Sequence, residues 1–409
     1  AERLPAYYDM LERGTGLLRD MLLETPPNAG GGLRDLVAAL KLGNRFRRQS
    51  QEEHRDLLDL FTKSAGEILD DWFESDPVKA VFGFDAIVGN YASPYTPGSA
   101  YVLLHHVFGE ANGQAGQWGH AMGGMGAITQ AMRAEAVARG VTIRTDAAVR
   151  AVDVQAGRAS GLSLVNGEGI QARAVAANVN PKLLFEQLVA PEHLPADFRN
   201  RIRRYRNGSG SFRINVALSE LPRFTAAPAD DPEAGTRSGI IMAPSLAYME
   251  QAYFDARQIG YARKPIVEML IPSTVDDSLC PEGAHVASLF CQQFAPDPAE
   301  GWDALKSEAV DAIFDTVNDF APNFRDSLLG FKALSPLDLE RDFGLMGGDI
   351  FHGAMGLDQL FSARPVLGHG NYRAPLPGLY LCGSGTHPGG GVTGAPGHNA
   401  AKEMIRDLG

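Results

Sequence analysis

The chain has 409 residues and a formal net charge of −12, from 37 Lys and Arg against 49 Asp and Glu. Because polyanions are bound by clustered cations, this balance argues against nucleic acid as a partner. With 44% hydrophobic and 21% charged residues, the composition is that of a folded protein of two or three packed units. No run approaches the roughly 20 consecutive apolar residues of a membrane-spanning helix, so we expect no transmembrane segment.

The chain has only three cysteines, Cys280, Cys291 and Cys382, and no Cys-x-x-Cys spacing. Three are too few for a disulfide framework and are typical of a reducing compartment. We therefore expect a cytoplasmic protein without dithiol redox chemistry. No His, Cys and Asp residues stand at zinc spacing, so no metal site is expected.

Residues 1–118 predict a helical region in which no chemistry is visible. Apolar residues recur at helical spacing in three stretches, and an Asp-Pro pair marks the start of a fourth helix: 4–22, 33–42, 58–72 and Asp76-Pro77. Gly43 is expected to end the second of these helices. We expect the helices to form a lid or wall.

Residues 119–183 predict a helix, a strand and then a three-stranded meander. The helix follows a glycine patch and ends at Gly140, and its alanines recur at spacings that let its backbone lie close to a neighbour. Asn166-Gly167 is a strong hairpin turn signal. The expected strands are 141–145, 149–155, 159–165 and 170–179.

Residues 184–345 predict a mixed sheet with helices, since strand-like runs alternate irregularly with helical patterns. The expected elements are strands at 212–218, 239–242, 266–271, 286–291 and 328–334, and a helix at 302–320.

The segment 378–409 is the one that carries chemistry. A short apolar strand at 379–382 leads into a loop, 383–397, with seven glycines, and then into an amphipathic helix. Glycines let main-chain amides approach a ligand closely, and a helix N-terminus favours electron-rich groups. The alternative is a turn that merely reverses the chain, but such connections usually need only about 2 to 6 residues. A flat cofactor with a diphosphate tail is the expected ligand.

The usual dinucleotide fingerprint, Gly-x-Gly-x-x-Gly after an early strand with an acidic residue about 20 positions on, is absent. The chain also begins with Ala1, inside a predicted helix. We therefore expect a fragment whose first nucleotide-binding unit is missing and which is itself inactive.

Three motifs together resemble the phytoene desaturase-like flavoproteins of the flavin amine oxidase superfamily. They are GHAMGGMGAITQAM at 119–132, GDIFHGAMGLDQLF at 348–361 with Arg364-Pro365, and GLYLCGSGTHPGGGV at 378–392. The nearest branch is the one named for pyridine nucleotide-disulfide oxidoreductase domain-containing protein 2, although this chain lacks the paired cysteines of that name. The resemblance covers essentially the whole chain.

The resemblance implies an α/β fold with two discontinuous parts, in which the N-terminal nucleotide-binding unit of a Rossmann-like FAD domain is missing. The substrate domain comprises a helical part, 1–118, and a mixed-sheet part, 184–345. The FAD-domain segments are 119–183 and 346–409.

The resemblance also implies the cofactor contacts. Gly383, Ser384 and Gly385 are expected near the pyrophosphate and ribityl chain, where Ser384 replaces the acidic residue of many relatives. The other expected contacts are main-chain N–H groups of Gly390, Gly391 and Val392 at the pyrimidine edge, Val149 beside the adenine, and Gly123, Gly124 and Met125 beside the ring or its substrate.

Catalytic residues are harder to assign. His387 in the glycine loop, and His120 and Trp118 before the glycine patch, are candidates, but a hydrogen-bonded structural role is the simpler interpretation of each lone histidine. Three further groups are expected to be structural. They are His105-His106 as wall or core, the arginines at 201–206 as a solvated face with phosphate contact as the alternative, and Asp349 and His352 near Arg364, with ordering of the loop over the flavin as the alternative.

The resulting hypothesis is an FAD-dependent oxidoreductase that removes hydride from a carbon centre of a small, largely apolar substrate and passes the electrons to a separate acceptor. The first alternative is a non-catalytic flavin-fold binding or assembly protein. The second is a desaturase or isomerase of carotenoid-like polyenes, which a lipid-length tunnel along the N-terminal helices would favour. A homodimer is compatible with the sequence, which does not fix the oligomeric state.

Overall fold

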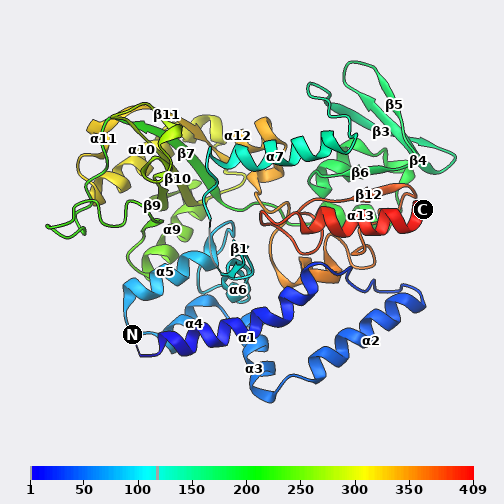
Figure 1. The fold of residues 1–409 in the computed structure, drawn as a ribbon, viewed down its shortest axis with the longest axis horizontal. Coiled ribbons are helices and arrows are strands. Elements are labelled where there is room, and N and C mark those ends of the chain that lie inside the picture. Colours follow the sequence, from blue (N-terminus) through cyan, green and yellow to red (C-terminus); the bar gives the residue numbers. More distant parts are fainter. Residues whose placement is uncertain (1, 117–118) are drawn as a thin grey trace.

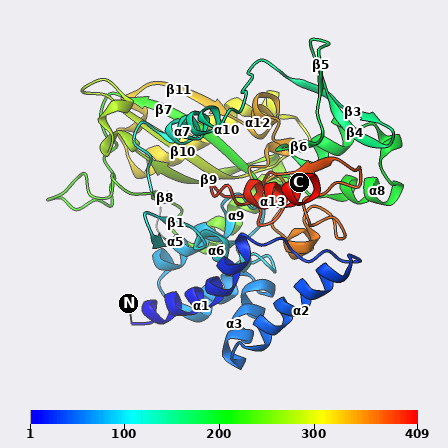
Figure 2. The same ribbon diagram turned by 45° about the vertical axis from the view of Figure 1, so that its right-hand side comes forward.

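The computed structural model describes residues 2–116 and 119–409. A five-stranded sheet with its helices lies on one side, and the glycine-loop segments lie on the other (Figure 1). A layer of N-terminal helices runs beneath both parts, as the turned view also shows (Figure 2). Within the described ranges, no helix is long and apolar enough to cross a membrane.

The N-terminal layer contains more helices than the sequence suggested. They are α1 (Leu4–Leu22), α2 (Leu33–Arg47), α3 (Gln51–Thr62), α4 (Ala65–Trp72), α5 (Asp76–Ile87) and α6 (Ala100–His106). The prediction that Gly43 ends the second helix was wrong, because α2 continues through it to Arg47. The predicted helix 58–72 is two helices, because Ser64 and Glu67 form a capping box that starts α4.

The substrate sheet is antiparallel, with strand order β11-β7-β10-β9-β8. Its strands are β7 (Ser211–Leu218), β8 (Ile240–Met242), β9 (Tyr261–Leu270), β10 (His285–Phe294) and β11 (Leu328–Leu334). One face forms a core with α10 (Trp302–Phe320), in which alternate residues such as Phe212, Ile214 and Leu289 are fully buried. The remaining helices of this region are α8 (Ala196–Arg204), α9 (Leu246–Ile259), α11 (Phe324–Ser327) and α12 (Pro336–Phe343).

The other part combines a meander with a parallel strand pair. The meander is β3 (Val149–Gln155), β4 (Arg158–Leu164) and β5 (Gly169–Gln171), and the pair is β6 (Val175–Ala177) with β12 (Leu379–Leu381). The predicted strand 170–179 therefore splits, because its second half leaves the meander to pair with β12. The predicted strand 141–145 was wrong, since these residues form no ladder and Val141 and Ile143 are exposed.

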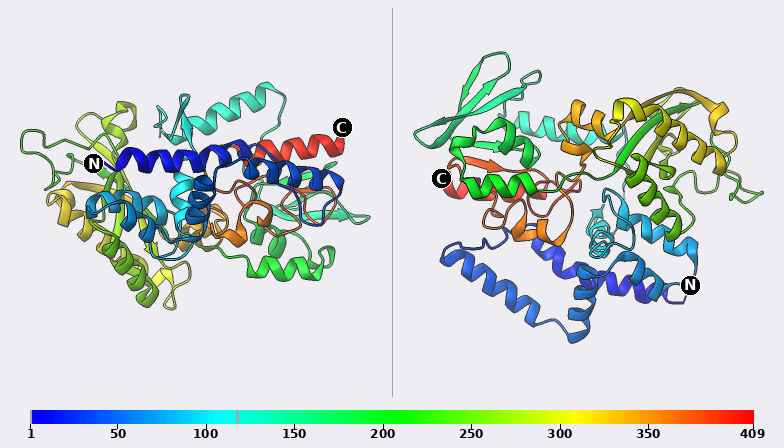
Figure 3. Two further views of the ribbon diagram at one scale, coloured as in Figure 1. Left: turned by 90° about the horizontal axis from the view of Figure 1, so that it is seen from below. Right: turned by 180° about the vertical axis from the view of Figure 1, so that it is seen from behind.

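Two helices flank this part. One is α7 (Met125–Ala138), which has no buried residue, and the other is α13 (Ala395–Leu408), which follows the glycine loop. Seen from below, α1 runs toward α13 (Figure 3). Asn399 Nδ2 donates to the Leu22 carbonyl at 2.9 Å, so the first helix directly supports the last one.

Candidate functional site

The buried half of the glycine loop, residues 383–390, is packed against other segments of the chain. A Cβ on Gly383 would lie 2.2 Å from Asn178 Oδ1, and one on Gly385 would lie 2.5 Å from the ring of Pro181. A Cβ on Gly390 would lie 2.0 Å from Phe351 Cδ1. These three glycines are therefore required by the packing of the protein itself. Ser384, between them, is only partly buried.

The exposed half of the loop, residues 391–394, offers main chain to the surroundings. Gly391 and Gly394 have φ of +124° and +70°, and a Cβ on Gly394 would meet nothing within 4 Å. Val392 is 80% exposed. At the N-terminus of α13, the Thr393 hydroxyl accepts from Ala395 N at 3.1 Å and Pro396 has no N–H, so this end of the helix contributes mainly its partial positive charge. Bare main chain beside a helix N-terminus fits the electron-rich edge of a planar cofactor.

Arg364 holds the buried half of the loop. Its guanidinium is fully buried and donates to the carbonyls of Ser384 at 2.9 Å, Phe351 at 2.7 Å and Gln359 at 3.0 Å. One side chain thus joins the glycine loop to the segment 351–359. An arginine suits this role because its planar fork of donors serves several carbonyls at once.

Asp349 and His352 lie next to this arrangement, as the sequence suggested. Asp349 accepts from the main-chain N–H groups of Gly208 and Phe351, both at 2.8 Å. Burial raises the pKa of Asp349, and burial lowers the pKa of His352. Asp349 orders the turn, whereas His352 Nδ1 is buried without a partner.

His387 fixes the loop to α1. Its Nε2 donates to the Met21 carbonyl at 3.0 Å, and its ring packs edge-on against Phe361. Burial lowers the pKa of His387 to about 4, so the ring is neutral at physiological pH. Its own carbonyl accepts from Tyr372 at 2.9 Å. These contacts support a structural role.

The glycine patch lies elsewhere in the fold. Gly123 and Gly124 have φ near +80°, and Gly124 is the N-cap of α7, which begins at Met125. Gly123 N donates to Asp276 Oδ2 at 2.6 Å, which ties the patch to the substrate domain. His120 is exposed beside it, and Trp118 lies outside the described residues.

Val149 is the partly exposed first residue of β3, opposite Leu164. Among the described hydrogen bonds, none joins Val149 or the glycine patch to residues 383–392. The contacts expected of these positions remain predictions.

His105, which the sequence suggested was wall or core, touches the glycine loop. Its ring lies edge-on to Phe351, with centroids 5.7 Å apart, and makes a hydrogen bond to the Gly390 main chain. Burial lowers the pKa of His105 to about 3, and its Nδ1 has no partner. No local pattern could have revealed this contact, because the two residues are far apart in the sequence.

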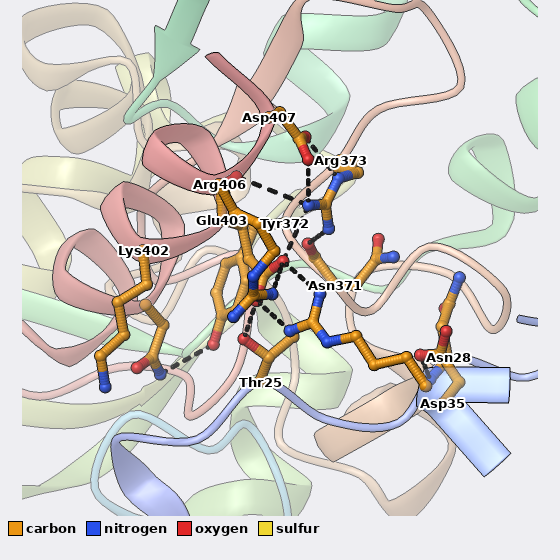
Figure 4. A network of polar contacts seen from close by, with 12 residues as sticks. Thr25, Asn28, Asp35, Asn371, Tyr372, Arg373, Lys402, Glu403, Arg406 and Asp407 are labelled. Atoms are coloured by element: carbon orange, nitrogen blue, oxygen red, sulfur yellow. Dashed lines mark hydrogen bonds and ion pairs between the residues drawn. The ribbon is translucent and has the colours of Figure 1, made fainter. Parts of the chain in front are cut away.

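A buried carboxylate on α13, that of Glu403, ties this helix to other segments of the chain (Figure 4). Glu403 is fully buried and accepts from Arg34 and Arg373 at 2.8 Å and from Arg406 and Thr25 at 2.7 Å. Arg34 lies on α2 and Thr25 on the α1–α2 connection, so one carboxylate joins both termini of the fold. Within the described ranges, no cluster of His, Cys, Asp and Glu could hold a metal ion.

Comparison with known proteins agrees with this architecture. Residues 6–235 match the family described as "Flavin containing amine oxidoreductase". The rat pyridine nucleotide-disulfide oxidoreductase domain-containing protein 2 is 42% identical over 428 aligned positions, which cover all of this chain and 73% of the relative. The lycopene-forming phytoene desaturase of Pantoea ananas is 23% identical, covering 82% of this chain and 65% of that protein.

An oxidoreductase from Methanosarcina mazei has a similar fold, with a TM-score of 0.56 at 15% identity, covering 92% of this chain and 74% of that one. The chain belongs to the flavin-containing amine oxidoreductase family, a family of FAD-dependent oxidoreductases, as its motifs predicted. The mixed α/β fold expected from the resemblance is confirmed.

Proposed function

We propose that this protein is an FAD-dependent dehydrogenase that removes hydride from a carbon centre of a largely apolar substrate and delivers the electrons to a separate acceptor. The observation that supports the proposal is the exposed main chain at 391–394 beside the N-terminus of α13. When bound, FAD supplies the hydride-accepting chemistry.

The residues of the chain would hold and polarise the cofactor. The N–H groups of Gly391 and Val392 and the N-terminus of α13 would face the pyrimidine edge, where donors stabilise negative charge. Arg364 and His387 would keep the loop in place through the contacts described above. This role requires main-chain donors rather than a particular side chain.

The cavity beside the N-terminal helices gives no support to a carotenoid-like polyene as the substrate. This cavity of about 1290 Å³ lies between the N-terminal helices, the sheet and the segment 346–358. Its lining includes several charged residues: Lys182, Arg203, Arg204, Arg206, Asp297, Glu340 and Asp358. An apolar tunnel for a lipid-length polyene would not be lined in this way. None of the residues 383–397 lines this cavity.

The test is to express the protein from its complete reading frame and to reduce it by light without oxygen. The expected result is a yellow protein with FAD, which is bleached by light and reoxidised by a defined acceptor. A preparation that never takes up FAD would refute the proposal. A yellow protein that is inert to every donor and acceptor would instead support the non-catalytic alternative.

A further inference from the structure

One face of the substrate sheet carries a row of charged and aromatic residues. In the register of the sheet, Phe290 on β10 pairs with both Arg213 on β7 and Glu268 on β9. These three side chains therefore share a face, opposite the one that packs on α10. Phe290 and Ile266 on this face pack against the core of the N-terminal helices. The row therefore lies between the sheet and that helical layer.

Arg213 is partly buried in this row and has no hydrogen-bonding partner there. Its guanidinium lies over the ring of Phe290, 5.1 Å from the centroid. Among the described contacts, none is a hydrogen bond or ion pair of this guanidinium. Glu268, on the far side of β10, interacts electrostatically with Arg213, but among the described contacts the two side chains form no hydrogen bond or ion pair.

The arginine, rather than the nearby carboxyl groups, requires a partner. Burial raises the pKa of Glu268 and of Asp85 on α5 to about 7, so each can lose its charge by binding a proton. Arg213 cannot become neutral in a comparable way, because a guanidinium stays charged at physiological pH. Burial lowers the pKa of Arg213, so an acceptor that brought a negative charge to its guanidinium would stabilise the charged form.

A second donor on the same face also lacks an acceptor. Gln292 lies two residues beyond Phe290 on β10 and is fully buried. Its Oε1 accepts from Gly89 N at 3.1 Å and from Ser211 Oγ at 3.3 Å, but its Nε2 has no hydrogen-bonding partner among the described residues. Buried amide groups are usually satisfied, so this unpaired donor independently indicates a missing acceptor.

This face is also close to the glycine loop. Gly89, which donates to Gln292, lies against the ring of Phe351, where an added Cβ would be 2.4 Å from Cε2. The same ring packs on Gly390. Gly89 and Phe351 therefore connect the buried amide of Gln292 to the loop through direct contacts.

We propose that Arg213, held over Phe290, binds the carboxylate of an otherwise apolar substrate on this face of the sheet, with Gln292 as a second donor. The proposal rests on the proposed function and adds the chemical class of the substrate. A planar monoanion matches the donor fork of arginine. A phosphate dianion would bring a second negative charge toward Glu268 and Asp85. Leu334 and Ile241 stand at the two ends of this row, and their apolar side chains suit the apolar part of the substrate.

The test compares three probes of equal chain length, decanoate, decylamine and decanol, by calorimetric titration of the holoprotein. The expected result is that decanoate binds most tightly. Arg213→Gln should weaken it by about 10- to 100-fold, the effect of losing charge-assisted hydrogen bonds. Arg213→Lys should restore part of the affinity, because it keeps the charge but not the fork. Arg223→Gln, the same charge change at an exposed surface position, should have no effect.

The inference would be overturned if decylamine or decanol bound more tightly than decanoate. It would also be overturned if Arg213→Gln bound decanoate as tightly as the parent does. FAD content and photoreduction of each variant are measured in parallel. If a yellow, photoreducible Arg213→Gln protein binds decanoate like the parent, the inference fails and the proposed function stands. If the parent binds no FAD, the proposed function fails, whatever the titrations show.

Discussion

Asp85→Asn is expected to stabilise the protein at pH 8 and to stabilise it less at pH 5. Asp85 lies on α5 and makes no hydrogen bond to a described residue through its carboxyl group. Burial raises its pKa from 3.8 to about 7. The folded state therefore holds this proton more tightly than the unfolded state. Stability is lost as the pH rises from about 4 to about 7, because the unfolded chain gives up the proton first.

The size of the expected stability change follows from the shift in the pKa of Asp85. Each pKa unit corresponds to about 1.4 kcal/mol, so a rise from 3.8 to about 7 corresponds to about 4 kcal/mol. Water that reaches the ionised carboxylate reduces this figure, and we expect a gain of about 2 to 4 kcal/mol for Asp85→Asn at pH 8. At pH 5 the carboxyl group is still protonated in the folded parent but already ionised in the unfolded chain, whose pKa is 3.8, so only part of the stability is lost and the expected gain falls to about 1 to 2 kcal/mol.

The assay is urea unfolding of both proteins at pH 5 and pH 8, followed by circular dichroism. Buried histidines with lowered pKa values, His105 and His387 among them, make the parent less stable as the pH falls. The difference between variant and parent removes their contribution. Asp71→Asn, at an exposed position on α4, is the control and should show no pH-dependent gain. A variant that is equally or less stable than the parent at pH 8 would refute the reasoning.

Three further outcomes follow from the loop and its supports. Gly390→Ala should lower the free energy of unfolding by about 1 to 3 kcal/mol or more, because its Cβ overlaps the Phe351 ring; urea unfolding measures this. Val392→Glu should weaken FAD binding about tenfold in a fluorescence titration, because it brings negative charge to the proposed pyrimidine edge. Ile405→Glu, at an exposed position farther along α13, should not weaken it. Glu403→Gln should cost about 3 to 5 kcal/mol of stability, measured from the urea midpoint, because three guanidinium groups lose their shared counter-charge.

Local features of the fold could be predicted where the cause is local. The Asn166-Gly167 turn is present, with Gly167 at φ +90°, because glycine adopts that conformation without strain. The helix predicted at 302–320 is α10, with the same bounds. The break between α3 and α4 carried a local signal too, the Ser64 and Glu67 capping box, which the apolar periodicity across 58–72 obscured.

Long-range pairings could not be predicted in the same way. Val175–Ala177 looked like a continuation of the meander, but its ladder partner is Leu379–Leu381, some 200 residues along the chain. Nothing near Arg213 indicates that its direct neighbour on β10 would be a phenylalanine rather than a carboxylate. Such contacts depend on which strands meet, and a hydrophobic pattern does not specify that.

The glycine loop shows why its many glycines could not be assigned a single role from the sequence. Gly383, Gly385 and Gly390 are needed because protein atoms occupy the space that a Cβ would fill. Gly394 faces open space and has φ of +70°, so its left-handed backbone rather than packing within the chain favours glycine there. Substitutions in the buried half should therefore change stability first, and substitutions in the exposed half should change cofactor binding first. That division makes the flavin hypothesis testable at adjacent residues of one loop.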